Sequence, residues 1–284
     1  MNRLAIETST EQLSVAVSAR GQVWSHQGPG GAQASAGLLA AVHAVLAQAG
    51  LALNDIGVIT MGRGPGSFTG LRTACAVSQG LAFGLELGIV PIDTLLALAE
   101  EGRHLCAAGL SEAKAGAENA ATMPTQPGVG VLASPNLEGI ARFYAVIDAR
   151  MGQLYTAAYE HRAGLWHTVQ EPAVQNPADC ALPLAWSGQP VWAVGLAQHL
   201  LPNLALPWVL AHPTASALLR LADRPRPMGA KCPPRWPCRC TCATKWPKPP
   251  PNAPWPRPTP RPLEARPGPE PCRTIAPCLP LPPP

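Results

Sequence analysis

The chain has 284 residues, of which 47% are apolar and 13% charged, a balance typical of one or two folded domains. Residues 1–222 carry 10 Lys and Arg against 14 Asp and Glu, whereas residues 223–284 carry 11 against 3 and hold 22 of the 35 prolines. The overall charge of +4 therefore describes neither part. It gives no support for nucleic-acid binding by the folded portion.

The sequence gives no sign of a membrane or secreted protein. No apolar run approaches the roughly 18–20 residues of a membrane span. The N-terminus enters a strand pattern at Arg3–Glu7 without a basic segment and an apolar core before it. The cysteines of the first part lie in apolar contexts, which is typical of a reducing compartment; they are Cys75, Cys106 and Cys180. We therefore expect a cytoplasmic protein with no membrane association.

Hydrophobic periodicity predicts a first lobe in which strands come first and helices follow. Gln33–Ala49 and Thr69–Leu87 have helical spacing of their apolar residues. The segments predicted as strands are Leu4–Ile6, Leu13–Val17, Gln22–Trp24, Gly57–Met61 and Gly88–Ile92. This order predicts a mixed sheet with helices packed on it, an α/β fold.

A second lobe is predicted to begin near Tyr144. Its expected elements are strands Tyr144–Ile147, Gln153–Tyr159 and Val191–Val194, followed by a helix over Thr214–Leu221. Ala107–Gly139 is rich in Ala, Gly and Pro without periodicity, which predicts a poorly ordered insertion. The expected division is a first lobe at 1–106, the insertion at 107–140, a truncated second lobe at 141–222 and a tail at 223–284.

A glycine-rich turn at Gly62–Arg72 lies between a predicted strand and a predicted helix. Its glycines permit tight turning, and its free N–H groups could face an anion. The candidate phosphate-loop positions are Gly64, Gly66, Ser67 and Thr69. No Lys-Ser/Thr pair follows the glycines, so the segment is not a P-loop. The alternative is a strand-to-helix turn with Ser67 or Thr69 as the N-cap.

Glu7, Thr8 and Ser9 follow the first predicted strand. An acidic residue followed by hydroxyls at a strand end can hold a hydrated Mg²⁺ and a phosphate. The alternative is a turn in which the hydroxyls satisfy local backbone groups, and without a partner loop this alternative is favoured. Together with the glycine-rich turn, these residues are candidates for a vestigial nucleotide site.

Small residues mark the two predicted helices of the first lobe. Gly80, Gly84 and Gly88 recur every four residues, although a glycine inside a helix costs about 1 kcal/mol relative to alanine. Close approach of another backbone would offset that cost, either within the chain or across a subunit contact. We expect a subunit contact. The predicted interface residues are Leu38, Ala40, Val42, Leu71, Ala74, Gly80 and Gly84.

Other chemistry is disfavoured by the sequence. Its seven histidines include no pair at helical metal-binding spacing, so we expect no metal ligands. No Gly-x-Ser-x-Gly elbow appears, which argues against a hydrolase of that type. We expect no catalytic residues.

The motifs together resemble a known family. The segments Leu4–Thr10, Gly62–Arg72, Gln79–Gly84 and Ile147–Tyr159 are similar to the TsaB family, dimerization subunits of the bacterial complex that makes threonylcarbamoyladenosine in tRNA. The similarity covers about residues 1–222 apart from the insertion. Glu7 stands where an aspartate is usual in that family, and the first helix lacks the histidine often seen near Ala34.

The resemblance implies a two-lobed, actin-like fold of the ASKHA type with RNase H-like sheets. It implies a non-catalytic subunit that pairs with a metal-bearing catalytic paralogue, TsaD, and is joined by an ATPase, TsaE. A homodimer is an alternative pairing, and tRNA would be met indirectly. No cofactor of its own is implied, because ATP and the metal belong to the partners.

Two other functions compete with this interpretation. An ASKHA-type ATPase or kinase would use Glu7–Thr10 and Gly62–Arg72 around a nucleotide. A metallopeptidase is the weakest hypothesis, because a His-x-x-x-His pair is missing.

Residues 223–284 are rich in Pro, Arg, Cys and Trp and have no apolar period. A basic polyproline arm is one interpretation, and zinc binding is another. The cysteines involved, Cys232, Cys238, Cys240 and Cys242, lack paired Cys-x-x-Cys knuckles. Translating the codons of Cys238–Lys248 one base earlier allows the pattern P-[LMV]-Y-[LMV]-R-x-x-V-A, which resembles the usual C-terminal segment of the TsaB family. We therefore interpret the tail as a disordered frameshift product without function.

Overall fold

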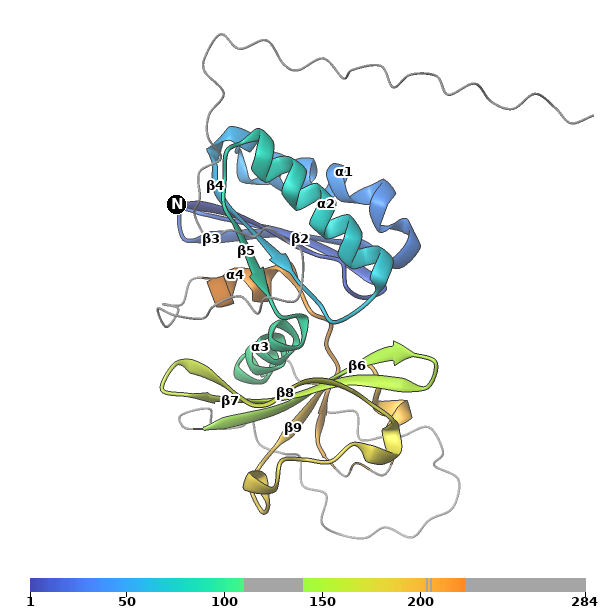
Figure 1. Ribbon diagram of the computed structural model, residues 1–284. Helices are drawn as coiled ribbons and strands as arrows, with labels where there is room; N and C mark the ends of the chain where they lie inside the picture. The colour runs from blue at the N-terminus through green and yellow to red at the C-terminus, as the bar shows by residue number, and fades with distance from the viewer. Residues whose placement is uncertain (110–139, 203, 205, 223–284) are drawn as a thin grey trace, which may run out of the picture. The chain divides into compact units, whose positions relative to one another are not determined.

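The first sheet has the strand order β3-β2-β1-β4-β5 (Figure 1). The computed structural model describes residues 1–109, 140–202, 204 and 206–222. The first three strands pair antiparallel, and the last two run parallel to β1. The strands are β1 (Asn2–Glu7), β2 (Gln12–Ala19), β3 (Gln22–Pro29), β4 (Ile56–Gly62) and β5 (Ile89–Ile92). β1 and β2 are buried along most of their length, as strands covered on both faces should be.

Helices α1 (Ala34–Ala49) and α2 (Phe68–Gly84) cover one face of this sheet (Figure 1). Their inner stripes pack in the same core as Leu4 and Ile59 of the sheet. α1 ends at Gly50, whose φ of 64° is the left-handed conformation that glycine adopts at helix ends. The Ser67 side chain caps α2 by accepting a hydrogen bond from Gly70 N.

The second sheet repeats the topology of the first. Its order is β10-β9-β6-β7-β8, again with three antiparallel strands followed by two strands parallel to the first of the three. The strands are β6 (Ala141–Arg150), β7 (Gln153–Arg162), β8 (Leu165–Gln175), β9 (Trp192–Gly195) and β10 (Trp208–Val209). The connections that match α1 and α2 in the first lobe contain only short 3-10 turns among the described residues: η3 (Pro177–Asp179), η4 (Leu184–Trp186) and η5 (Gln198–Leu200).

The last helix of each half packs on the sheet of the other half. α3 (Thr94–Ala107) follows β5 but shares a core with Phe143 and Ala145 of β6. α4 (Ala215–Ala222) follows β10 but packs on Ala5 and Ala16 of the first sheet. Figure 1 shows both helices between the two sheets. Each lobe is therefore completed by a helix from outside its own run of strands.

A buried carboxylate connects the exchanged helices. Glu100 of α3 is fully buried and accepts hydrogen bonds from Arg103, from the indole of Trp166 on β8 and from Arg220 of α4. Glu101 accepts from Arg220 and from Thr214. Arg220 therefore joins two carboxylates of α3 to α4. A buried charge is tolerated because its hydrogen bonds are made, and removing one partner of such a pair typically costs about 3–5 kcal/mol.

The structure contains every strand and helix expected from the periodicity, although β3 and β6 are more than twice as long as expected. Among the described residues it also contains one α-helix and two strands that the sequence did not predict, α3, β8 and β10, besides short 3-10 turns. The insertion at 107–140 falls mostly, and the tail at 223–284 wholly, outside the described residues, together with the proposed zinc cysteines and the frameshift.

The sequence predicts no apolar run long enough to span a membrane. By length and composition alone, one helix of the described chain is long and apolar enough to do so. Gly31–Ala49 is one helix of 19 residues in the described chain that meets both criteria. It consists of η1 (Gly31–Gln33) and α1. Its inner residues belong to the core against the first sheet, and core helices meet the same criteria.

Two glycines of α2 allow opposite predictions about stability. A methyl group at Gly70 would overlap the carbonyl oxygen of Thr8, whereas one at Gly80 would meet nothing within 4 Å. We expect Gly70→Ala to destabilise the isolated chain by about 1–3 kcal/mol through overpacking. Gly80→Ala should stabilise it by up to about 1 kcal/mol through helix propensity. Urea unfolding of both variants checks this, and a similar loss in both would contradict the close approach at Gly70.

Candidate functional site

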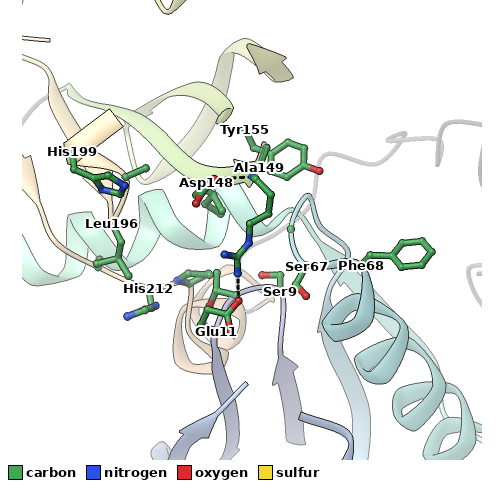
Figure 2. Close-up of a pocket in the computed structure, with 17 residues that line it drawn as sticks. Ser9, Glu11, Ser67, Phe68, Asp148, Ala149, Tyr155, Leu196, His199 and His212 are labelled. Atoms are coloured by element: carbon green, nitrogen blue, oxygen red, sulfur yellow. Dashed lines mark hydrogen bonds and ion pairs between the residues drawn. The ribbon is translucent and has the colours of Figure 1, made fainter. Parts of the chain in front are cut away.

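Equivalent hairpins of the two lobes meet at one site. The turn after β1 carries Glu11. Arg150, the last residue of β6, lies at the turn to β7, and its guanidinium forms an ion pair with the Glu11 carboxylate (Figure 2, dashed at Glu11). Arg150, Met151 and Gly152 all have left-handed φ values, 69°, 54° and 75°. Asp148 stabilises this turn by accepting a hydrogen bond from Arg150 N at 2.7 Å. The conformation therefore directs Arg150 toward the first lobe.

The glycine-rich turn packs against the β1–β2 hairpin. Ser67 N donates to Ser9 O, and Thr8 Oγ1 donates to Gly70 O, both at 2.7 Å. A side chain at Gly66 would overlap Ser9 O. Close backbone approach within the chain therefore accounts for these glycines, and Ser67 is the helix N-cap that the alternative interpretation named.

The other positions of the predicted phosphate loop divide between the interior and the surface. Gly64 has a φ of 95° and exchanges hydrogen bonds with Thr94 at the start of α3. Thr69 is exposed, and its carbonyl accepts from Thr73. The structure thus brings Thr8, Ser9, Gly66 and Ser67 together and leaves Thr69 outside.

Glu7 is a buried carboxyl beneath this turn. Its Oε1 accepts from Ser9 N at 2.7 Å, and its Oε2 has no hydrogen-bond partner. Its carboxylate also approaches Gly62 so closely that a side chain there would overlap it. Burial raises the pKa of Glu7 above its ordinary value, although the nearby Ser9 and Thr94 groups favour the ionised form.

A cavity of about 430 Å³ opens between the hairpins (Figure 2). The first lobe contributes Ser9, Glu11 and Ser67 to its lining. The second contributes residues of the β6–β7 hairpin and of the loops that follow β9 and β10: Ile147, Asp148, Arg150, Tyr155, Leu196, His199, Ala211 and His212. These loops lie at the carboxyl ends of parallel strands, where ligands of α/β folds bind. Sequence reasoning missed the two histidines, because no local motif surrounds them.

The predicted interface residues divide between core and surface. Leu38, Val42 and Ala74 are at most 1% exposed and belong to the core beneath the exposed helical face. Leu71 is partly buried, whereas Ala40, Gly80 and Gly84 are exposed.

The exposed surface of α1 and α2 has both apolar and small residues. Leu39 and Phe83 are 50% and 63% exposed. A side chain added at Gly80 or Gly84 would meet nothing within 4 Å. No close packing within the described chain therefore accounts for these two glycines. Arg72 lies 3.6 Å above the Phe68 ring at the first turn of α2.

Among the described residues, no group of three or more His, Cys, Asp or Glu side chains is placed to hold a metal ion. The cavity therefore has polar side chains but no preformed metal cluster in this part of the chain.

Known proteins resemble this chain in sequence. A family profile described as TsaD, tRNA N6-adenosine threonylcarbamoyltransferase, matches residues 26–111. The tRNA threonylcarbamoyladenosine biosynthesis protein TsaB of Escherichia coli is 34% identical over 178 residues, which are 62% of this chain and 63% of the relative. The protein of the same name from Haemophilus influenzae is 41% identical over 102 residues, 36% of this chain and 43% of the relative. The chain thus spans less than two thirds of the length of these curated relatives.

Solved structures extend the similarity. YeaZ from Pseudomonas aeruginosa is 30% identical with a TM-score of 0.61, over 78% of this chain and 90% of that chain. A protein described as uncharacterized, with similarity to peptidase YEAZ from Pseudomonas aeruginosa, is 28% identical with a TM-score of 0.62, over 78% and 89%.

Two sheets of the same topology, each completed by the helix of the other half, define a two-lobed α/β fold of the actin-like ASKHA class. Within that class, the chain belongs to the family of TsaB and YeaZ proteins.

The buried Glu7 predicts a pH-dependent stability. The ordinary pKa of this carboxyl is about 4.5, and its pKa in the folded protein is higher. Below about pH 4.5 the carboxyl is therefore protonated in both states, and its burial does not lower the free energy of unfolding through ionisation. Its ionisation destabilises the fold as the pH rises through the folded pKa. Glu7→Gln removes that ionisation while keeping an acceptor for Ser9 N. We expect this variant to melt several degrees higher than the parent chain at pH 8, with a smaller difference at pH 5.

The control is Glu171→Gln on β8, where the carboxylate is exposed. Thermal melts at both pH values decide the matter. If Glu7→Gln raised the melting temperature by the same amount at pH 5 and at pH 8, the result would contradict a buried Glu7 carboxyl with a raised pKa.

Proposed function

We propose that this protein is a non-catalytic dimerization and scaffold subunit for the synthesis of N6-threonylcarbamoyladenosine in tRNA. The relatives named for threonylcarbamoyladenosine biosynthesis support the pathway. The observation that carries the scaffold role is the exposed face of α1 and α2, where Gly80 and Gly84 have open space around them. Glycines on an exposed helical face are unfavourable for the single chain and useful where another backbone approaches.

The partner that fits this face is a TsaD-type catalytic paralogue. The match of residues 26–111 to the TsaD profile covers α1 and α2, so this chain and TsaD-type proteins share the segment that would meet. Related surfaces can pair helix to helix about a pseudo-twofold axis. A second copy of this chain could use the same face, and a homodimer is the alternative when the paralogue is absent.

The remaining parts of the complex would lie outside this subunit. A TsaE-type ATPase would supply ATP turnover, and the metal would belong to the catalytic paralogue, which leaves this chain without a cofactor of its own. The complex would work in the cytoplasm, where tRNA is modified.

The charge distribution supports an indirect role for tRNA. Six arginines of the described chain form ion pairs with carboxylates: Arg63, Arg103, Arg142, Arg150, Arg162 and Arg220. Arg20 donates to Ala49 O, and Arg72 stacks on Phe68. Binding of a phosphate backbone needs several available cations, so most of the positive charge in the described residues is already engaged.

The first test of this proposal is a packing change on the helical face. We expect Gly84→Trp and Ala40→Trp to abolish co-elution with the TsaD-type paralogue in size-exclusion chromatography, because a close helical contact cannot admit an indole. The isolated variants should stay folded, since both positions are exposed. Ala185→Trp in η4 is the matched control and should co-elute normally. Unaltered co-elution of Gly84→Trp would place the interface elsewhere.

The second test is reconstitution with one component omitted at a time. We expect modification of tRNA to require this chain and the paralogue together, and we expect this chain alone to hydrolyse no ATP above background. ATP turnover by the purified chain would support the alternative function, an ASKHA-type ATPase or kinase. Modification without the metal-bearing paralogue would exclude the scaffold role.

A further inference from the structure

The outer edge of the first sheet is formed by β3, the outermost strand in its order (Figure 1). All eight residues of β3, Gln22–Pro29, pair with β2 without a register shift, so the strand is long and regular. No backbone hydrogen bond joins β3 to any further element of the described chain. Because alternate N–H and C=O groups of an edge strand point away from its sheet, β3 can pair with another strand.

The other sheet edges in the described ranges are protected against such pairing. β5 and β10 have only four and two residues. β8 contains Glu171 and Pro172, and its pairing with β7 shifts register twice. Short strands, charges, prolines and bulges are the usual means by which proteins prevent edge-to-edge association. β3 contains no Asp, Glu, Lys or Arg, and its proline is the last residue, Pro29. It is therefore the unprotected edge.

The side chains of β3 are compatible with a second copy of the same strand. In an antiparallel pair with a twofold axis at Ser25, Val23 of each copy lies opposite Gln27 of the other, and Trp24 lies opposite His26. Val23, Ser25 and Gln27 are exposed, whereas Trp24 and His26 are half-buried. Exposed residues thus meet exposed residues. Like charges placed directly opposite would destabilise the pair, and this arrangement brings none together.

Charges at the two ends of β3 complement each other in this arrangement. Arg20 is exposed at the turn before the strand, and Gly30 follows the strand and donates its N–H to the Glu11 carbonyl. The Glu11 side chain is also exposed. The same axis places Arg20 of each copy opposite Gly30 of the other, and thus near Glu11. Opposite charges therefore approach at both ends of the pair, which favours this orientation.

Helix α1 leaves room for the pairing. It packs over both β2 and β3, so the two copies of α1 would be separated by two strand spacings. Neighbouring strands lie about 4.8 Å apart, which places the helices about 10 Å apart. Packed helices have interaxial distances of about 8–10 Å. The exposed residues of α1 include Gly37 and Ala44, whose small size permits this approach. The helices would therefore touch without overlapping.

We propose that this chain forms a twofold dimer in which the β3 edges of two copies pair antiparallel and join the two first sheets into one. The proposal goes beyond the scaffold role. It assigns the second copy to a strand edge, whereas the face proposed for the paralogue includes the exposed side of α2.

Ser25 lies on the proposed axis, so one substitution there tests the contact. We expect the full chain to sediment as a dimer with rising concentration, measured in a reductant because the chain has nine cysteines. Ser25→Lys places two ammonium groups opposite each other and should weaken the dimer at least about tenfold. Hydrogen exchange of the Gln22–Pro29 amides should slow as the parent chain dimerises, whereas exchange in β8 should not change.

A charge exchange separates loss of the contact from loss of the fold. Ser25→Glu alone should also be monomeric, but an equimolar mixture of Ser25→Lys and Ser25→Glu should dimerise, because opposite charges then meet across the axis. The matched control is Thr168→Lys, which introduces the same charge at an exposed position of the β8 edge and should leave the dimer unaltered.

Three results would overturn the proposal. A parent chain that stays monomeric at every concentration would exclude the dimer, and a Ser25→Lys chain that sediments like the parent would place self-association elsewhere. A mixture of the two Ser25 variants that stays monomeric would exclude the axis at Ser25. Gly84→Trp alters α2 and should dimerise like the parent whether or not it binds the paralogue. The failure of this proposal and the failure of the scaffold role are therefore distinguishable.

Discussion

The fold depends on one buried carboxylate, Glu100. Its two oxygens accept hydrogen bonds from Arg103 on the same helix, from Trp166 of the second sheet and from Arg220 of the last helix. Such a charge is stable in the interior only when every partner is in place, so the network specifies how α3, β8 and α4 pack together. The packing between the two lobes is therefore determined by the geometry of these hydrogen bonds as well as by the burial of apolar side chains.

At the Arg150–Glu11 ion pair, the lobes meet through a much weaker contact. The Arg150 and Glu11 side chains are each 67% exposed, and an exposed ion pair contributes at most about 1 kcal/mol. Within the first lobe, the backbone of Thr8 and Ser9 lies close to Gly66 and Gly70, where a side chain would overlap it. Gly66 in the loop and Gly70 in the first turn of α2 thus serve internal packing, whereas no close contact within the described chain accounts for Gly80 and Gly84 of the same helix. Gly70 and Gly80 are only 10 residues apart, yet glycine is present at each for a different physical reason. Local sequence patterns cannot distinguish the two reasons.

Most of the first lobe was predictable because its strands and helices have clean apolar periods. α3 was missed because Glu100 and Glu101 interrupt its apolar stripe, although Glu100 is buried. β8 was missed because its residues lie mostly at intermediate burial, without strict alternation. In the candidate site, Glu7, Ser9 and Ser67 were found through their motifs. His199 and His212 come from loops that only the duplicated topology places together, so only the repeated strand order could have suggested them.

The position of α4 has a consequence for how the chain is made. Ser14 Oγ accepts a hydrogen bond from Ala215 N, across 201 residues, and the same helix covers Ala5, Ala16 and Ile92 of the first sheet. During synthesis at about 5–20 residues per second, the inner face of that sheet stays open for roughly 10–40 s after its β2 strand has left the ribosome. Until then its apolar surface is available to chaperones or to misassociation. The first lobe is thus translated first, but its sheet is covered only when the last described helix has been made.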